Sequence, residues 1–219
     1  FPADLSGSIC SANLCACRKG VKEVIECQDV SFSYPASALP DSESQTGGAL
    51  KHISCTIEDG SFVLLCGTSG CGKTTMTRLF NGLIPHYHEG TYTGSVYLDG
   101  KDTRDLSLFD ISLKVGSVFQ NPRSQFFNVD TTSELAFGPE NHGMPEDIVR
   151  DRVKRVAAQL KLEPLLDRSI FSLSGGEKQK IACGSAAAID PDVYVLDEPS
   201  SNLDAYAIAD FRQLLFTLK

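Results

Sequence analysis

The fold is decided by one stretch of sequence, Gly67-Thr68-Ser69-Gly70-Cys71-Gly72-Lys73-Thr74. It follows the apolar run Phe62–Cys66, which we interpret as a strand, and it precedes helix-like sequence from Met76. The spacing G-x-x-x-x-G-K-[ST] between a strand and a helix is typical of a phosphate-binding loop. Glycines let the backbone N–H groups turn inward, and the helix N-terminus attracts an anion. A chance glycine-rich turn is the alternative, but the context favours a nucleoside triphosphate site.

Each residue type in this loop suits one part of a nucleotide. We expect Lys73 to bind the β- and γ-phosphates and to act in catalysis, and Thr74 to ligate Mg²⁺ through its hydroxyl. Thr75 can donate to a phosphate oxygen. The predicted nucleotide-binding set in the loop is Gly67, Thr68, Ser69, Gly70, Cys71, Gly72, Lys73, Thr74 and Thr75.

Composition limits the classes of function. The chain has 219 residues, 42% of them hydrophobic, enough for one sizeable core. Its net charge of −8 argues against nucleic acid as a partner, because phosphate backbones select basic surfaces. No apolar run approaches the roughly 20 residues that span a bilayer, so a membrane role would require a partner. Residues 1–20 show no secretory signal, and we expect the chain to be a piece of a longer protein.

The 8 cysteines do not form the pattern of a disulfide framework. We expect free thiols in a reducing cytosol. Cys10, Cys15 and Cys17 have the spacing C-x4-C-x-C, which leaves a metal site as the alternative, although the spacing matches no familiar zinc pattern.

The remaining sequence predicts strands alternating with helices, hence an α/β fold. Residues 1–20 are expected to be a linker or an ill-ordered lead-in, and 21–219 a nucleotide-binding domain. Strands are predicted at 21–34 (a pair), 50–57, 94–98, 115–119 and 193–196, with a long exposed loop over 35–48. A helical subdomain is expected over about 125–189. Its clearest helix is marked by an apolar stripe: Val149, Val153, Val156 and Leu160.

Asp197 and Glu198 directly follow the apolar strand Val193–Leu196. At the carboxyl end of a buried parallel strand, Asp197 can hold Mg²⁺, and Glu198 can polarise a water in line with the γ-phosphate. Charged residues often end strands, so the pair alone is weak evidence. Beside a phosphate-binding loop, we interpret it as catalytic.

The stretch Leu173-Ser174-Gly175-Gly176-Glu177-Lys178-Gln179 begins a helix, because Ser174 and Glu177 form a capping-box pattern. Two glycines in its first turn leave bare N–H groups at the positive end of the helix dipole, open to an anion. An ordinary capped helix is the alternative for this stretch in isolation.

Together these motifs resemble an ATP-binding-cassette (ABC) ATPase. The motifs are the phosphate-binding loop, Gln120, LSGGEKQ at 173–179, VLDEP at 195–199 and Ser201-Asn202-Leu203-Asp204, in that order. The resemblance covers residues 21–219 and implies a mixed core sheet with an N-terminal antiparallel β subdomain and a helical signature subdomain. The sequence looks closer still to the ATPase subunits of energy-coupling-factor (ECF) importers of vitamins and transition metals. The stretches that suggest this are Asn81–His86, Val118–Pro122 with Gln125, and Ala136–Asn141.

The resemblance implies head-to-tail dimers with a second ABC domain, identical, non-identical or in tandem in a parent chain. Ser174, Gly175 and Gly176 would then contact the ATP held by the partner's phosphate-binding loop. Tyr34 would stack on adenine, although a plain strand-end tyrosine is the alternative. Gln120 would reach Mg²⁺ and the attacking water, and Asp204 would link the two sites across the dimer. Gln125 receives no role.

The resemblance also implies a peripheral position at the cytoplasmic face of the cell membrane, through a transmembrane coupling protein and a substrate-binding membrane protein. The family's switch histidine lies beyond the last residue here, so the chain as given is expected to hydrolyse ATP weakly. The transported substrate is not encoded. A soluble ABC ATPase acting on ribosomes or DNA is the alternative function, and a small-molecule kinase fails to explain LSGGEKQ.

Overall fold

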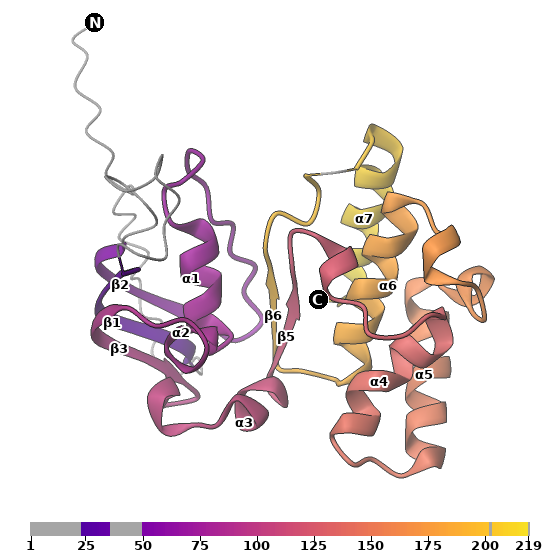
Figure 1. The fold of residues 1–219 in the computed structure, drawn as a ribbon, viewed down its shortest axis with the longest axis horizontal. Helices are drawn as coiled ribbons and strands as arrows, with labels where there is room; N and C mark the ends of the chain where they lie inside the picture. The colour runs from indigo at the N-terminus through magenta and orange to yellow at the C-terminus, as the bar shows by residue number, and fades with distance from the viewer. Residues whose placement is uncertain (1–22, 36–49, 202, 219) are drawn as a thin grey trace, which may run out of the picture. The chain divides into compact units, whose positions relative to one another are not determined.

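The structure is a computed structural model that describes residues 23–35, 50–201 and 203–218 (Figure 1). The chain divides into two compact units, Phe1–Ile111 and Ser112–Lys219, and each is described by itself. The predicted linker over 1–20, its three cysteines and nearly all of the predicted loop over 35–48 lie outside the described residues. No helix in the described ranges is long and apolar enough to cross a membrane.

The first unit is built on a four-stranded antiparallel sheet with the order β2-β1-β3-β4. Its strands are β1 (Glu23–Ser33), β2 (Leu50–Glu58), β3 (Thr91–Leu98) and β4 (Lys101–Asp102). Asp99 and Gly100 join β3 to β4 with positive φ angles of 50° and 76°, as a tight hairpin turn requires. The predicted strand pair over 21–34 is wrong in its described part. Residues 23–33 form one strand, bulged between Cys27 and Val30, so a change of register accounts for the broken alternation.

Short helices complete this unit: α1 (Lys73–Phe80), α2 (Leu83–His86), η2 (Thr103–Asp105) and α3 (Leu108–Ser112), which ends at the unit boundary. Leu79 and Ile84 are fully buried. The predicted strand over Phe62–Cys66 is wrong, because these residues form no strand and Leu64 is 75% exposed. An apolar run becomes a strand only when another backbone pairs with it, and none of the four described strands of this unit does so.

The second unit combines a pair of parallel strands with a helical core. β5 (Val115–Val118) pairs in register with β6 (Val193–Leu196). The helices are α4 (Thr131–Asn141), α5 (Glu146–Leu160), α6 (Gly175–Ala188) and α7 (Ala205–Leu218), with single turns η3 (Pro122–Ser124), η4 (Glu163–Leu165) and η5 (Ile170–Ser172). These elements confirm the predicted α/β class, while the proposed domain boundaries stay predictions.

The predicted apolar stripe forms one side of the core of this unit. Val149, Val153, Val156 and Leu160 on α5 are all buried and pack with residues of α4, α6 and α7. The sequence pattern therefore predicted this helix and its inward face. β6 differs from expectation, since only Val195 of its four residues is buried.

Candidate active site

The phosphate-binding loop leads directly into α1 through Gly72, whose φ of 99° lies in the left-handed region. A residue with a Cβ would be strained there, so glycine is needed at this position. Gly67 is needed for a different reason, since a Cβ on it would lie 2.4 Å from Cys71 Sγ. The chain thus turns sharply and presents the first turn of α1 beside the loop, as an anion site requires.

Lys73 and the two threonines lie on the first turn of α1. The Lys73 ammonium donates to the carbonyls of Gly67 (3.2 Å) and Thr68 (3.1 Å), so the cation is held against its own loop. Thr74 is half-buried and Thr75 is buried. All of the predicted loop residues are therefore contiguous in space, although their binding roles stay predictions.

Tyr34 lies at the end of β1, in the same unit as the loop. Its hydroxyl accepts a hydrogen bond from Arg78 of α1 at 2.8 Å. Its ring meets Phe32 and His88 edge to face. Arg78 thus ties the predicted adenine-stacking residue to the helix that follows the phosphate-binding loop, and the stacking itself stays a prediction.

The second group of predicted residues meets at the carboxyl ends of β5 and β6. The Asp197 N–H donates to the Val118 carbonyl at 2.9 Å and continues the ladder by one step. Asp197 is buried, and Glu198 has a positive φ of 44°. Gln120 Nε2 donates to Glu198 Oε2 at 3.0 Å. Two residues that are 78 positions apart in the sequence are therefore brought into direct contact.

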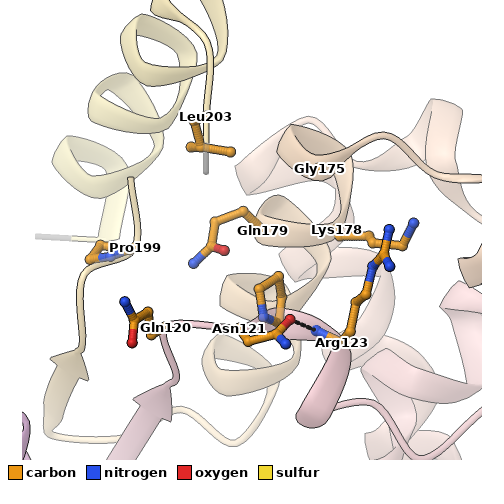
Figure 2. Close-up of a pocket in the computed structure, with 9 residues that line it drawn as sticks. Gln120, Asn121, Arg123, Gly175, Lys178, Gln179, Pro199 and Leu203 are labelled. Atoms are coloured by element: carbon orange, nitrogen blue, oxygen red, sulfur yellow. Dashed lines mark hydrogen bonds between the residues drawn. The ribbon is translucent and has the colours of Figure 1, made fainter. Parts of the chain in front are cut away.

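A pocket of about 460 Å³ opens beside this contact. Figure 2 shows Gln120 and Asn121 on one side, Pro199 and Leu203 on another, and Gln179 of α6 between them. Gln179 is almost fully buried, and its Nε2 makes no hydrogen bond. The other lining residues are Pro122, Arg123, Gly175 and Lys178. The first turn of α6 and the Gln120 loop thus border one cavity.

The N-terminus of α6 has the predicted capping box. Ser174 Oγ accepts from the Glu177 N–H, and Glu177 Oε2 accepts from the Ser174 N–H at 2.7 Å. Mainly that last hydrogen bond, with smaller contributions from the Ser174 hydroxyl and Arg168, holds the pKa of Glu177 below its usual value. Ser174 and Gly175 are exposed. The first N–H groups of a helix have no partner within it, so the exposed Gly175 presents a backbone donor at this end of α6.

Asp204 has a structural role that the sequence analysis did not assign. Its carboxylate accepts from the Ala207 N–H at 2.8 Å, which caps the N-terminus of α7. It is exposed. Its predicted link across a dimer stays a prediction.

Gln125 and Glu134 support the backbone of this unit, although no role was predicted for either from the sequence. Gln125 makes two hydrogen bonds to the backbone of β5 and the residue after it. Glu134 is 1% exposed, and its Oε2 accepts from the N–H groups of Phe127 and Asn128. The available signals were a second glutamine, five residues after Gln120, and an acidic residue on the inner face of a helix.

The features of the two units can be compared with those of known proteins. The family model for ABC transporters matches residues 50–201. The chain therefore belongs to the ABC transporter family, and its fold is that of an ABC ATPase domain.

Two relatives with similar names match most of this chain. A protein of Treponema denticola, provisionally named an ABC transporter ATP-binding protein, is 47% identical over 196 residues, 90% of this chain and 38% of the relative. One from Pyrococcus horikoshii is 45% identical over 184 residues, 83% of this chain and 61% of the relative. The chain thus spans less than two thirds of these relatives.

Among solved structures, CbiO1 from Clostridium perfringens, part of the ABC transporter complex CbiONQ, is similar with a TM-score of 0.74. The two share 26% sequence identity, and the match covers 90% of this chain and 74% of CbiO1.

Proposed function

We propose that this chain binds ATP and hydrolyses it as the energising subunit of a membrane importer of the ECF type. Membership of the ABC transporter family supports ATP as substrate. The similarity to CbiO1, a component of a transporter complex, supports the importer, as do the ECF-like stretches Asn81–His86, Val118–Pro122 and Ala136–Asn141. The substrate class would be a vitamin or a transition metal.

The phosphate-binding loop is the proposed site of the β- and γ-phosphates. The Lys73 ammonium already lies on the loop, bonded to carbonyl oxygens that a phosphate oxygen can replace as acceptors. The left-handed Gly72 begins α1 directly after the loop, and the first N–H groups of a helix attract an anion. Binding would therefore exchange weak neutral acceptors for charged ones.

Glu198 is proposed as the general base for hydrolysis. The hydrogen bond between Gln120 and Glu198 is the main observation that supports this role. The amide donor orients the carboxylate at the edge where parallel strands end, the usual place for ligands in such sheets. An oriented carboxylate can accept a proton from a water that attacks the γ-phosphate. Lys73 would stabilise the negative charge of the transferred group.

The proposed metal ligands suit Mg²⁺. The Thr74 hydroxyl, the Asp197 carboxylate and the Gln120 amide oxygen are all hard oxygen donors. The Gln120 Nε2–H donates a hydrogen bond to Glu198, which leaves the Gln120 amide oxygen as the atom to face a cation. When bound, Mg²⁺ would neutralise phosphate charge.

The exposed N-terminus of α6 is the proposed contact with a second ABC domain. Ser174, Gly175 and Gly176 would donate to the γ-phosphate of the ATP on that partner, and Asp204 would face the partner's site. A capped helix with a bare first turn favours an anion from outside its own chain. The motion of dimer closure would then be transmitted by the Gln120 loop and the helices of this unit. It would reach a transmembrane coupling protein and a substrate-binding membrane protein. The chain would lie peripherally at the cytoplasmic face.

A glutamate-to-glutamine pair of variants tests the catalytic assignment. Glu198→Gln should still bind ATP but lose about 10²- to 10⁴-fold in kcat, the usual contribution of a general base. Phosphate release and retention of radiolabelled ATP are measured on the full-length protein. Glu163→Gln, an exposed glutamate in the same unit, is the matched control and should behave as wild type. Wild-type turnover in Glu198→Gln would remove Glu198 from the mechanism.

A further inference from the structure

Gln125 bonds to the backbone on both sides of the last residue of β5. Its Oε1 accepts from the Phe119 N–H at 3.1 Å, and its Nε2 donates to the Ser117 carbonyl at 3.1 Å. A carboxamide has the same donor and acceptor as a peptide group. The side chain therefore takes the place of a neighbouring strand at this edge.

The opposite edge of β5 is already paired. β6 lies there, and the Asp197 N–H donates to the Val118 carbonyl at 2.9 Å. Successive backbone groups along a strand point to alternate sides, so Ser117 and Phe119 face away from β6 while Val118 faces toward it. The backbone that leads into Gln120 is thus held from both edges.

A tight turn explains how Gln125 returns to the strand so soon after leaving it. Asn121 caps η3 through a hydrogen bond from the Arg123 N–H, and Pro122 begins the turn. The Gln125 N–H closes the turn on the Pro122 carbonyl at 3.1 Å. The loop is therefore short, and its far end is fixed to its near end.

We propose that Gln125 is a positioning residue for hydrolysis, which holds Gln120 in contact with Glu198. This inference rests on the proposed roles of Gln120 and Glu198. Without the carboxamide, the Phe119 N–H and the Ser117 carbonyl lose the hydrogen bonds that Gln125 makes to them, and the end of β5 can shift. Gln120 directly follows Phe119, so it then loses the fixed geometry that brings its Nε2 to 3.0 Å from Glu198 Oε2. Small displacements of a catalytic group cost rate more than affinity.

The test is steady-state ATP hydrolysis by the full-length protein. Gln125→Ala should lower kcat by about 10- to 100-fold, a loss expected from a misplaced catalytic group. The KM for ATP should stay within about twofold, because the loop that binds the phosphates is unchanged. Gln213→Ala, an exposed glutamine on α7, is the matched control and should leave both constants unchanged.

A double-mutant cycle separates positioning from a general loss of structure. In a Gln120→Ala background, adding Gln125→Ala should lower kcat no further, because Gln125 acts through Gln120. If Gln125→Ala does not fold, Gln125→Glu takes its place in the cycle, since it has the same length and keeps the acceptor for Phe119 but not the donor for Ser117. A wild-type kcat in the folded variant, or a loss that adds in full to that of Gln120→Ala, would overturn the proposal.

Glu198→Gln distinguishes this failure from a failure of the proposed function. If Glu198→Gln abolishes turnover while the Gln125 variant keeps it, only the role of Gln125 is wrong. If Glu198→Gln turns over normally, the catalytic assignment itself is wrong.

Discussion

Glu177 stabilises the N-terminus of α6 and also fixes a residue of the proposed nucleotide contact. Its carboxylate accepts from the Ser174 N–H and from Arg168, so it closes the capping box of α6 and joins that helix to the preceding segment. The same hydrogen bond fixes the position of Ser174, one of the residues proposed to contact the nucleotide on a second ABC domain. The stability of the helix end and its proposed contact with a nucleotide therefore depend on one ionised side chain.

The ionisation of Glu177 makes stability depend on pH. Its pKa in the folded protein is lowered from 4.5, chiefly by the hydrogen bond from the Ser174 N–H. A lowered pKa means that this carboxylate stabilises the fold above pH 4.5, and that the contribution is lost as the pH falls through the lower folded value. Urea unfolding at pH 6 and pH 3 should show a larger loss for wild type than for Glu177→Gln. Equal losses in the two proteins would contradict this assignment.

At the scale of elements, the second unit depends on close packing of α4, α5 and α6. A Cβ on Gly184 of α6 would lie 2.8 Å from Leu135 of α4 and 2.6 Å from Leu162. Leu135 and Leu162 are fully buried. The two leucines therefore occupy the space that a side chain at position 184 would need.

Shortening Leu135 should create a cavity that a larger residue at 184 can partly fill. Leu135→Ala should lower the free energy of unfolding by about 2–5 kcal/mol. Gly184→Ala should cost more stability in the wild type than in the Leu135→Ala background, where one of the two close contacts is gone and only Leu162 must move. Asp151→Ala, an exposed change on α5, is the control and should have little effect. Denaturant unfolding provides the measurement, and an equal cost of Gly184→Ala in both backgrounds would contradict the packing described.

Elements were predictable from sequence where a local pattern determines them. The stripe on α5, the capping box of α6 and the strand before Asp197 follow from periodicity or spacing, and the structure has all of them. The absence of a strand over Phe62–Cys66 was not predictable, because pairing depends on a partner that apolar composition does not specify. Gln125 and Glu134 were missed for the same reason, since each acts on backbone that only the folded chain brings near it.

At the scale of the whole molecule, the predicted residues fall into two groups. The phosphate-binding loop and Tyr34 lie in one unit, and Gln120, Asp197, Glu198 and the capped α6 lie in the other. The order of motifs along the chain was enough to recognise the family, which the match over residues 50–201 confirms. The chain covers 38% of the Treponema denticola relative, so the proposed importer is a claim about a larger protein and its partners.

The central claim is that this chain energises a membrane importer, and the most direct measurement is of what it binds. The full-length protein is tagged, purified from solubilised membranes of its own host and analysed by mass spectrometry. The account predicts a polytopic membrane protein in stoichiometric amount, together with a small membrane protein that binds the transported substrate. Recovery from the soluble fraction alone, with ribosomal or DNA-repair proteins as partners, would contradict it.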